Sequence, residues 1–344
     1  MIEVPLLTPD LPGTGGLTRV AREDFHVEEL PLYEPSGEGE HLYLTVEKAG
    51  RTTPEVAREL AQALGAREAG TAGLKDKQAV TVQRISVQTR ASAEEALKLQ
   101  GPGFRVLAAA RHGNKLRPGH LRGNRFRVVV RGCERDALTR AIAICDRLRR
   151  DGAANLFGPQ RFGKYGDNAE LGRKLLLRET QVRDRFLRRM ALSALQSELF
   201  NRCLAARIAD GLFAAAIEGD VLRKRDSGGL FVCEAPAVDA LRVLSGEVDP
   251  AGPLPGHSLF AARGEALARE ERVLGEAQID PRSFAAGGGE MQGARRPYRI
   301  PVDELAVEPA GPDVLRLSFA LPRGSYALAV LREVIKSGPM PEES

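Results

Sequence analysis

The sequence predicts a mixed α/β protein with two domains. Alternating apolar residues indicate strands near 42–46, 80–87, 125–131 and 315–319, and helical periodicity indicates helices near 54–64, 136–150, 182–210 and 325–336. Composition changes near Gly152 and again near Arg299, after which the strand and helix pattern of the first half returns. This order is compatible with a domain at 152–299 inserted into a discontinuous domain at 1–151 and 300–344. A chain of 344 residues is long enough for two hydrophobic cores.

The strands differ in how regular their alternation is. In the first, Leu42, Leu44 and Val46 share one face, and in the third, apolar side chains alternate with arginines to give one apolar and one cationic face. In the second, the apolar positions change parity between Val82 and Ile85. We therefore predict a slip within that strand.

The helices are delimited by residues typical of helix ends. Pro54 stands in the first turn of its helix and Gly65 closes it, while Ser325 is the expected cap of the last helix. The longest helix, 182–210, is predicted to bury Phe186 and Met190 and to carry arginines on its solvent-exposed face.

Charge is unevenly placed, although the net charge is only +4. Residues 111–131 hold seven Lys or Arg and no acid, whereas the first fifty residues are rich in acids. A basic block suits a polyanion such as nucleic acid, and the alternative is a solvated face that keeps the protein in solution.

Several classes of protein are disfavoured by the residues present. The four cysteines have no CxxC spacing and the five histidines form no metal-binding pair, so we expect core cysteines and no zinc site. Neither a signal peptide nor a membrane span is visible, so we expect a soluble cytoplasmic protein. The run 158–164 fits a P-loop, but Tyr165 replaces the magnesium-binding hydroxyl and Pro159 removes an amide, which argues against a phosphohydrolase.

The segment 72–81 concentrates charge in a turn. Asp76 stands between Lys75 and Lys77, after Gly73 and before a strand. Neighbouring cations favour the ionised carboxylate, and a strand edge is a rigid place from which to present it. On these residues alone, a solvated turn is the more common interpretation.

Seven segments together resemble a known family. They are, in chain order, Glu23-Asp24-Phe25, 37–41 (GEGEH), 73–83 (GLKDKQAVTVQ), Asn124-Arg125-Phe126, 155–163 (NLFGPQRFG), 193–201 (SALQSELFN) and 321–333 (LPRGSYALAVLRE). These segments are similar to the signature motifs of the TruD family of pseudouridine synthases, and they span nearly the whole chain in family order. Each motif is weak alone, and their joint order makes the resemblance specific.

The resemblance implies both a fold and a reaction. It implies a catalytic pseudouridine-synthase domain with a mixed or antiparallel sheet and an inserted, mostly α+β TRUD domain, with a cleft between them that suits a tRNA arm. It implies isomerisation of uridine 13 in the D arm of tRNA, in which the N1–C1′ bond breaks and C5 bonds to C1′. The expected partner is tRNA, with no membrane, metal or small-molecule cofactor, and the expected state is a monomer.

The same resemblance assigns catalytic residues. The acid of the family's G-x-K-D motif falls on Asp76, which it makes the nucleophile, acting at the base or at the sugar. The basic residue before E-D-F falls on Arg19, where many members have lysine. Arg19 and Lys75 remain alternative cationic partners of Asp76.

Residues that bind the base follow from the same motifs. By motif match, Phe25, Phe126 and Tyr326 line the flipped base, and Asn124 forms a hydrogen bond to it. On alternation alone, Phe126 belongs to the core and Asn124 to a turn. The intact 73–83 motif favours an RNA isomerase over an RNA-binding or RNA-folding protein of the same fold without turnover.

Overall fold

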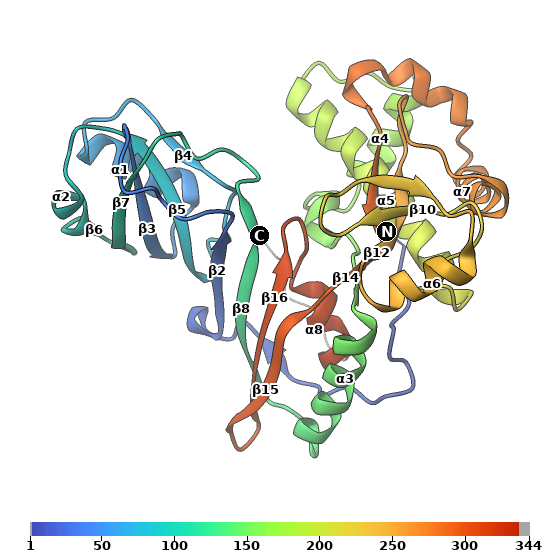
Figure 1. Ribbon diagram of the computed structural model, residues 1–344, viewed down its shortest axis with the longest axis horizontal. Coiled ribbons are helices and arrows are strands. Elements are labelled where there is room, and N and C mark those ends of the chain that lie inside the picture. The colour runs from blue at the N-terminus through green and yellow to red at the C-terminus, as the bar shows by residue number, and fades with distance from the viewer. Residues whose placement is uncertain (1, 337–344) are drawn as a thin grey trace. The chain divides into compact units, whose positions relative to one another are not determined.

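The computed structural model describes residues 2–336, without the side chains of 286–288, so residues 337–344 of the predicted discontinuous domain lie outside the described part. The chain divides into two compact units (Figure 1). The ten-stranded unit comprises 11–149, 302–327 and 334–336, and the four-stranded unit comprises 2–10, 150–301 and 328–333. The predicted boundaries lie within two residues of these divisions, but the sequence did not predict that 2–10 and 328–333 group with the four-stranded unit.

The ten-stranded unit is built on one mixed sheet. The main path runs β15-β16-β8-β2-β5-β3-β7-β6, with β1 added on β8 and β4 on β5. Among the described residues, β2 and β5 form the parallel pair of this sheet and its other neighbours are antiparallel, so the predicted mixed α/β class is confirmed. The strands are β1 (Leu17–Thr18), β2 (Phe25–Pro31), β3 (His41–Ala49), β4 (Ala69–Thr71), β5 (Val80–Gln88), β6 (Gln100–Gly101), β7 (Phe104–His112), β8 (Leu121–Arg131), β15 (Asp303–Gly311) and β16 (Val314–Pro322).

The register of these strands places several side chains in one row. Lys48 on β3 pairs with Thr81 on β5, which pairs with Val27 on β2; Val27 in turn pairs with Phe126 on β8, and Phe126 with Phe319 on β16. Directly paired residues project from the same side of a sheet, and residues two apart along a strand share that side. We call this side, which carries Val46 and Phe126, the core face.

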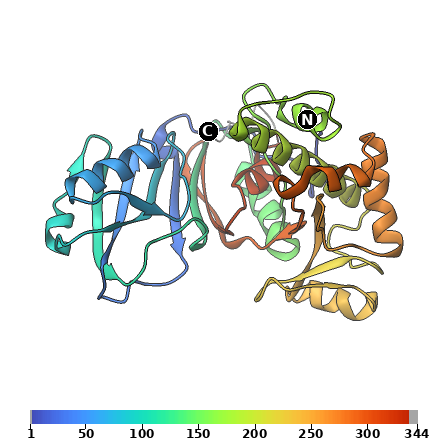
Figure 2. The ribbon, with the colours of Figure 1, turned by 90° about the horizontal axis from the view of Figure 1, so that it is seen from above.

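Helix α1 (Thr53–Ala63) covers one end of the core face (Figures 1 and 2). Thr52 caps it by accepting from the Glu55 amide, and its buried Val56 and Leu60 pack against Leu44 and other strand residues. The other helical segments with residues in this unit are η1 (Arg22–Asp24), α2 (Ala93–Leu97), α3 (Ala137–Asp151) and α8 (Leu328–Ile335). The predicted cap Ser325 is wrong, because α8 begins three residues later after Ala327.

Strand β5 is continuous, so the predicted slip is wrong. Its pairing with β3 runs without a register shift from Gln88 opposite His41 to Val80 opposite Ala49. The apolar pattern changes parity because two polar residues, Thr81 and Gln83, occupy fully buried positions on the core face. The irregular alternation therefore marks a polar site inside the sheet.

The four-stranded unit combines helices with a small sheet of order β11-β10-β12-β13. In its longest helix, α5 (Arg185–Ala209), the buried residues begin at Ala191. The predicted burial of Phe186 and Met190 is wrong, because they are 63% and 37% exposed. The other elements are β9 (Ala153–Ala154), η2 (Pro159–Phe162), α4 (Asn168–Leu176), β10 (Val221–Lys224), β11 (Leu230–Val232), α6 (Pro236–Leu244), β12 (Val248–Leu254), α7 (Gly264–Glu276), η3 (Pro281–Glu290), β13 (Ala294–Pro297) and β14 (Arg299–Ile300).

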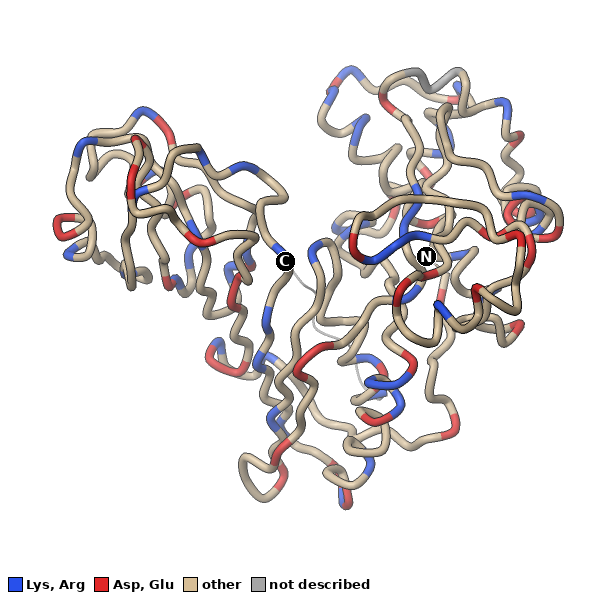
Figure 3. Tube along the Cα trace, viewed as in Figure 1, with Lys and Arg blue, Asp and Glu red and all other residues tan. Residues whose placement is uncertain are grey.

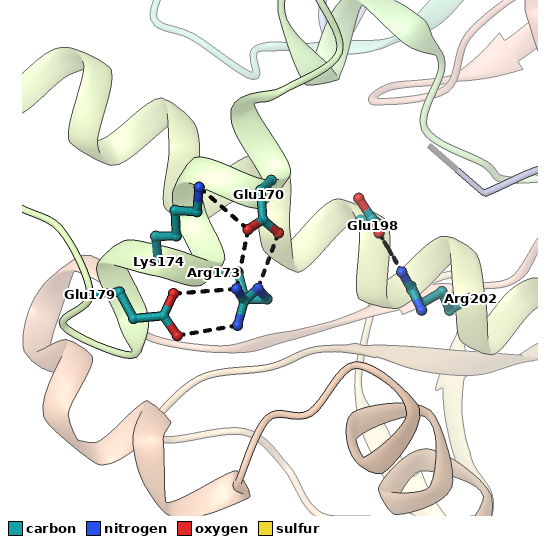
Figure 4. Close-up of polar contacts among 6 residues, drawn as sticks. All are labelled: Glu170, Arg173, Lys174, Glu179, Glu198 and Arg202. Carbon is teal, nitrogen blue, oxygen red and sulfur yellow. Dashed lines mark hydrogen bonds and ion pairs between the residues drawn. The ribbon is translucent and has the colours of Figure 1, made fainter.

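Ion pairs lie on the surface of α4 and α5 (Figure 4). Arg173 pairs with Glu170 at 3.0 Å and with Glu179 at 3.3 Å, and Arg202 pairs with Glu198 at 2.7 Å. Exposed pairs of this kind contribute about 0.5 kcal/mol or less each. They therefore explain little of the stability of the unit.

The structure also bears on the classes that the sequence disfavours. The P-loop-like run 158–164 forms the short 3-10 helix η2 after β9, whose partner β14 is antiparallel, so the strand and helix of a P-loop are not formed there. Cys145, Cys203 and Cys233 are buried, as predicted for core cysteines, and Cys133 is half-buried. Over residues 2–336, no helix is both long and apolar enough to cross a bilayer.

Candidate active site

Asp76 lies in a turn between β4 and β5, within the ten-stranded unit. Its Oδ1 accepts a hydrogen bond of 2.7 Å from the Gln78 amide, which fixes the carboxylate relative to its own backbone. The turn is also anchored outside itself, because the Lys75 amide donates to Thr53 Oγ1 at 3.0 Å and the Gly50 amide to the Lys77 carbonyl at 3.2 Å. The side chain of Asp76 is 12% exposed, so it is reachable yet meets little water.

Arg19 contacts the side-chain carboxylate of Asp76. Its Nη1 donates to Asp76 Oδ2, and its side chain is 8% exposed. The guanidinium also lies 3.9 Å over the ring of Phe25, so it is fixed between an aromatic face and a carboxylate. The backbone of Arg19 has φ of +59°, a left-handed conformation that residues other than glycine adopt rarely and that clusters at functional sites.

Lys75, the alternative partner, is directed elsewhere. Its Nζ forms an ion pair of 2.8 Å with Glu29 on β2, and both side chains are buried. Of the two cations considered from the sequence, the structure therefore pairs Arg19 with Asp76 and Lys75 with Glu29.

Three phenylalanines form an aromatic wall beside this ion pair. Phe25 meets Phe126 edge-on at 6.3 Å, and Phe126 stacks on Phe319 at 5.2 Å. All three rings are buried. The prediction that Phe126 shares a face with core residues is correct. Phe126 also contacts Phe25, the ring that Arg19 covers.

Asn124 stands two residues before Phe126 on the core face of β8, where it pairs with Glu29. Its Oδ1 is buried and has no hydrogen-bond partner among the described residues. An orphaned buried acceptor is unfavourable unless a ligand or water satisfies it. Tyr326 is half-buried and lies after the turn at 323–324, between β16 and α8 in the chain.

Sequence reasoning missed Lys48, Glu29 and Phe319. Lys48 is 1% exposed, and its Nζ donates to the carbonyls of Lys75 and Asp76 at 3.2 and 3.0 Å. Burial lowers its pKa to about 8, as does the charge of Lys75, while the charge of Asp76 acts in the opposite direction. The sequence did hold a sign of this buried lysine, because Lys48 continues the alternating apolar positions 42, 44 and 46.

The basic block 111–131 does not form one surface. Arg125 pairs with Glu28 and Glu304, and Arg131 with Asp24; both arginines project from the side opposite the core face. Figure 3 shows acidic and basic residues interspersed along the trace of the ten-stranded unit. With Lys115, which pairs with Glu68, three of the seven basic residues of the block are thus paired with acids among the described residues.

A smaller group of arginines lies next to the Asp76 turn. The Gly119 amide donates to the Ala72 carbonyl at 2.8 Å, which joins the loop 113–120 to the segment that carries Asp76. Arg117 is exposed on this loop and Arg122 is exposed at the start of β8, and Arg323 donates to the Gly119 carbonyl at 2.9 Å. None of these three arginines forms an ion pair with the described acids, so they present positive charge beside the turn.

These residues connect the Asp76 turn to the core face. Asp76 contacts Arg19, Arg19 covers Phe25 and Phe25 meets Phe126, while Asn124 lies opposite Glu29, which pairs with Lys75. A carboxylate shielded from water, a group of aromatic rings and an unsatisfied acceptor suit a planar ring with an N–H donor. Among the described residues, no cluster of three His, Cys, Asp or Glu side chains could hold a metal ion.

Known proteins are similar to this chain over nearly its whole length. The sequence model of the family described as tRNA pseudouridine synthase D (TruD) matches residues 1–182 and 180–334. The tRNA pseudouridine synthase D of Anaeromyxobacter sp. (strain Fw109-5) is 55% identical over 98% of this chain and 97% of its own, and that of a Thermus thermophilus strain is 46% identical over 96% and 92%. A crystal structure of the putative enzyme of that name from Methanosarcina mazei has a TM-score of 0.81 and 25% identity, and the match covers 97% of this chain and 96% of the other.

Proposed function

This chain belongs to the tRNA pseudouridine synthase D family, and we propose that it converts uridine to pseudouridine in tRNA, at uridine 13 of the D arm. The family predicted from the seven motifs is confirmed. The observation that carries the proposal for this chain is the buried Arg19–Asp76 pair beside the wall of Phe25 and Phe126.

The reaction is an isomerisation, so its atoms balance without a second substrate. The N1–C1′ bond breaks, the C5–C1′ bond forms, C5 loses a proton and N1 gains one. In this proposal Asp76 is the nucleophile, acting at C1′ or at C6 of the base, and Arg19 holds its carboxylate ionised and aimed. No cofactor is required by this bond balance.

The remaining predicted residues receive roles in the same proposal. The target uridine leaves its stack, and its base lies against Phe25 and Phe126 while Tyr326 covers it from the segment after β16. Asn124 Oδ1 accepts from N3–H of uracil, which supplies its missing partner. Lys75 keeps Glu29 neutralised beside this amide rather than contacting Asp76.

The two units have separate parts in the proposal. The ten-stranded unit is the catalytic domain, and residues 152–299 are the inserted domain that contacts the body of the folded tRNA. We propose that the protein acts as a monomer in the cytoplasm.

The test is tritium release from tRNA labelled with [5-³H]uridine, followed by mapping of pseudouridine in the product. Release occurs because C5 loses its hydrogen when it bonds to C1′. We expect the amount of tritium released to correspond to one uridine per tRNA. We expect the pseudouridine in the product to lie at position 13. Binding of tRNA without release would leave an RNA-binding protein of this fold, and release from another position would overturn the assignment to uridine 13.

The arginines beside the turn make a separate electrostatic prediction. Replacing Arg117 and Arg122 by glutamine is expected to weaken tRNA binding and to lower the slope of log Kd against log salt by about 1.4, because each lost phosphate contact removes about 0.7. Binding titrations between 50 and 200 mM salt measure this slope.

The matched control removes the same charge elsewhere in the ten-stranded unit. Arg58 and Lys98 are exposed on α1 and just after α2. Replacing both by glutamine should leave the slope unchanged. Equal slopes for the two double variants would show that Arg117 and Arg122 do not contact phosphates.

A further inference from the structure

A buried ammonium lies directly beneath the Asp76 turn. Lys48 is on the core face of β3, paired with Thr81, and is among the largest fully buried side chains of the protein. No ion pair joins it to a carboxylate within residues 2–336. An unpaired ammonium in such a place is unfavourable unless all its protons are bonded, and an apolar side chain would fill the same space without that cost.

All three protons of the ammonium have acceptors. Nζ donates to the carbonyls of Arg51, Lys75 and Asp76 at 2.9, 3.2 and 3.0 Å. Arg51 lies in the connection between β3 and α1, and the other two carbonyls belong to the turn itself. One side chain therefore joins the strand, the start of the helix and the backbone of the proposed nucleophile.

The turn needs such a donor because it is not part of a helix or strand. The carbonyls of Lys75 and Asp76 accept from Nζ, which belongs to a fully buried side chain. If these carbonyls moved, the Asp76 side chain would move with them, since its Cα is fixed between the two peptide groups. A displacement of about 1 Å in a reacting group costs about 10²-fold in rate.

We propose that Lys48 is a positioning residue for the isomerisation, whose ammonium fixes the Lys75–Asp76 backbone so that the Asp76 carboxylate meets both Arg19 and the target uridine. This inference rests on the proposed function of Asp76. It assigns Lys48 no contact with the RNA.

The test compares Lys48→Met with Val46→Ala. Methionine fills the space of lysine but donates no hydrogen bond, whereas Val46 is equally buried two residues away on the same face and does not bond to the turn. Single-turnover tritium release gives the rate of the bound complex, and a binding titration gives the tRNA Kd. We expect Lys48→Met to lose about 10²-fold in rate at an unchanged Kd, and Val46→Ala to keep both, although it unfolds at lower urea.

The outcomes separate this inference from the function on which it rests. Wild-type protein without tritium release would refute the proposed function itself. Active wild-type protein with a Lys48→Met rate equal to that of Val46→Ala would refute the positioning role. A parallel loss of rate in both variants would show that only the stability of the sheet is involved, and would also overturn the proposal.

A second measurement does not depend on activity. The pKa of Lys48 is about 8 in the folded protein, below its usual 10.5, because burial and Lys75 lower it more than Asp76 and Glu55 raise it. Between these values the unfolded chain holds a proton that the folded protein has released, so the free energy of unfolding rises with pH. The difference in unfolding free energy between wild type and Lys48→Met should therefore shift in favour of wild type from pH 7.5 to pH 10. A difference independent of pH would show that Lys48 is not buried beneath the turn.

Discussion

Asp76→Asn is expected to abolish tritium release, with a loss of at least about 10⁴-fold in single-turnover rate, while tRNA binding is retained. Asparagine keeps the size of the side chain, and its Oδ1 can still accept from the Gln78 amide, so the turn keeps its shape. The variant lacks the negative charge and the nucleophilic oxygen, and its amide group faces the Arg19 donor. Asp76→Ala should behave alike, since the oxygen that reacts is absent from both.

The control for this result removes a carboxylate from the other side of the same sheet. Glu47 on β3 pairs with Arg105 at 2.8 Å and projects away from the core face. Glu47→Gln should keep the wild-type rate and Kd. Release by Asp76→Asn at the rate of Glu47→Gln would refute Asp76 as the nucleophile, whatever the RNA affinity of the two variants.

The sequence predicted the parts of the site that follow a regular period. The alternation of β8 placed Phe126 on one face and the arginines on the other, because a strand that separates core from solvent repeats every two residues. The turn that alternation alone suggested for Asn124 is wrong, because Asn124 lies within β8 on the same face as Phe126. Strand β5 departs from this rule at Thr81 and Gln83, which are polar and fully buried. A prediction that expects only apolar residues in the core therefore places a slip in β5, although the strand is continuous and these two positions are polar.

The contacts of Asp76 could not be read from its neighbours in the chain. Lys75 and Lys77 flank it, yet in a turn adjacent side chains point apart, and Lys75 reaches Glu29 on another strand. The partner of Asp76 comes from 57 residues earlier and Lys48 from 28 residues earlier. Such pairings depend on strand order, and only the family motif pointed to Arg19.

Arg19→Gln is expected to have the second-largest effect, a loss of about 10²-fold or more in rate, together with about 3 kcal/mol of stability. Asp76 then loses its ion-pair partner in a site where both side chains are about nine-tenths buried, and Phe25 loses the cation over its ring. Single-turnover release and urea unfolding measure the two losses separately.

Arg19→Lys is the variant that distinguishes positioning of charge from general destabilisation. Lysine retains the positive charge that the carboxylate requires, but it lacks the planar group that covers Phe25. We therefore expect Arg19→Lys to lose stability and yet to keep the rate within about tenfold of wild type, because the electrostatic term at the carboxylate is preserved. Equal rates for Arg19→Lys and Arg19→Gln would show that the charge on Arg19 does not act on Asp76, and that its role lies in packing against the aromatic wall.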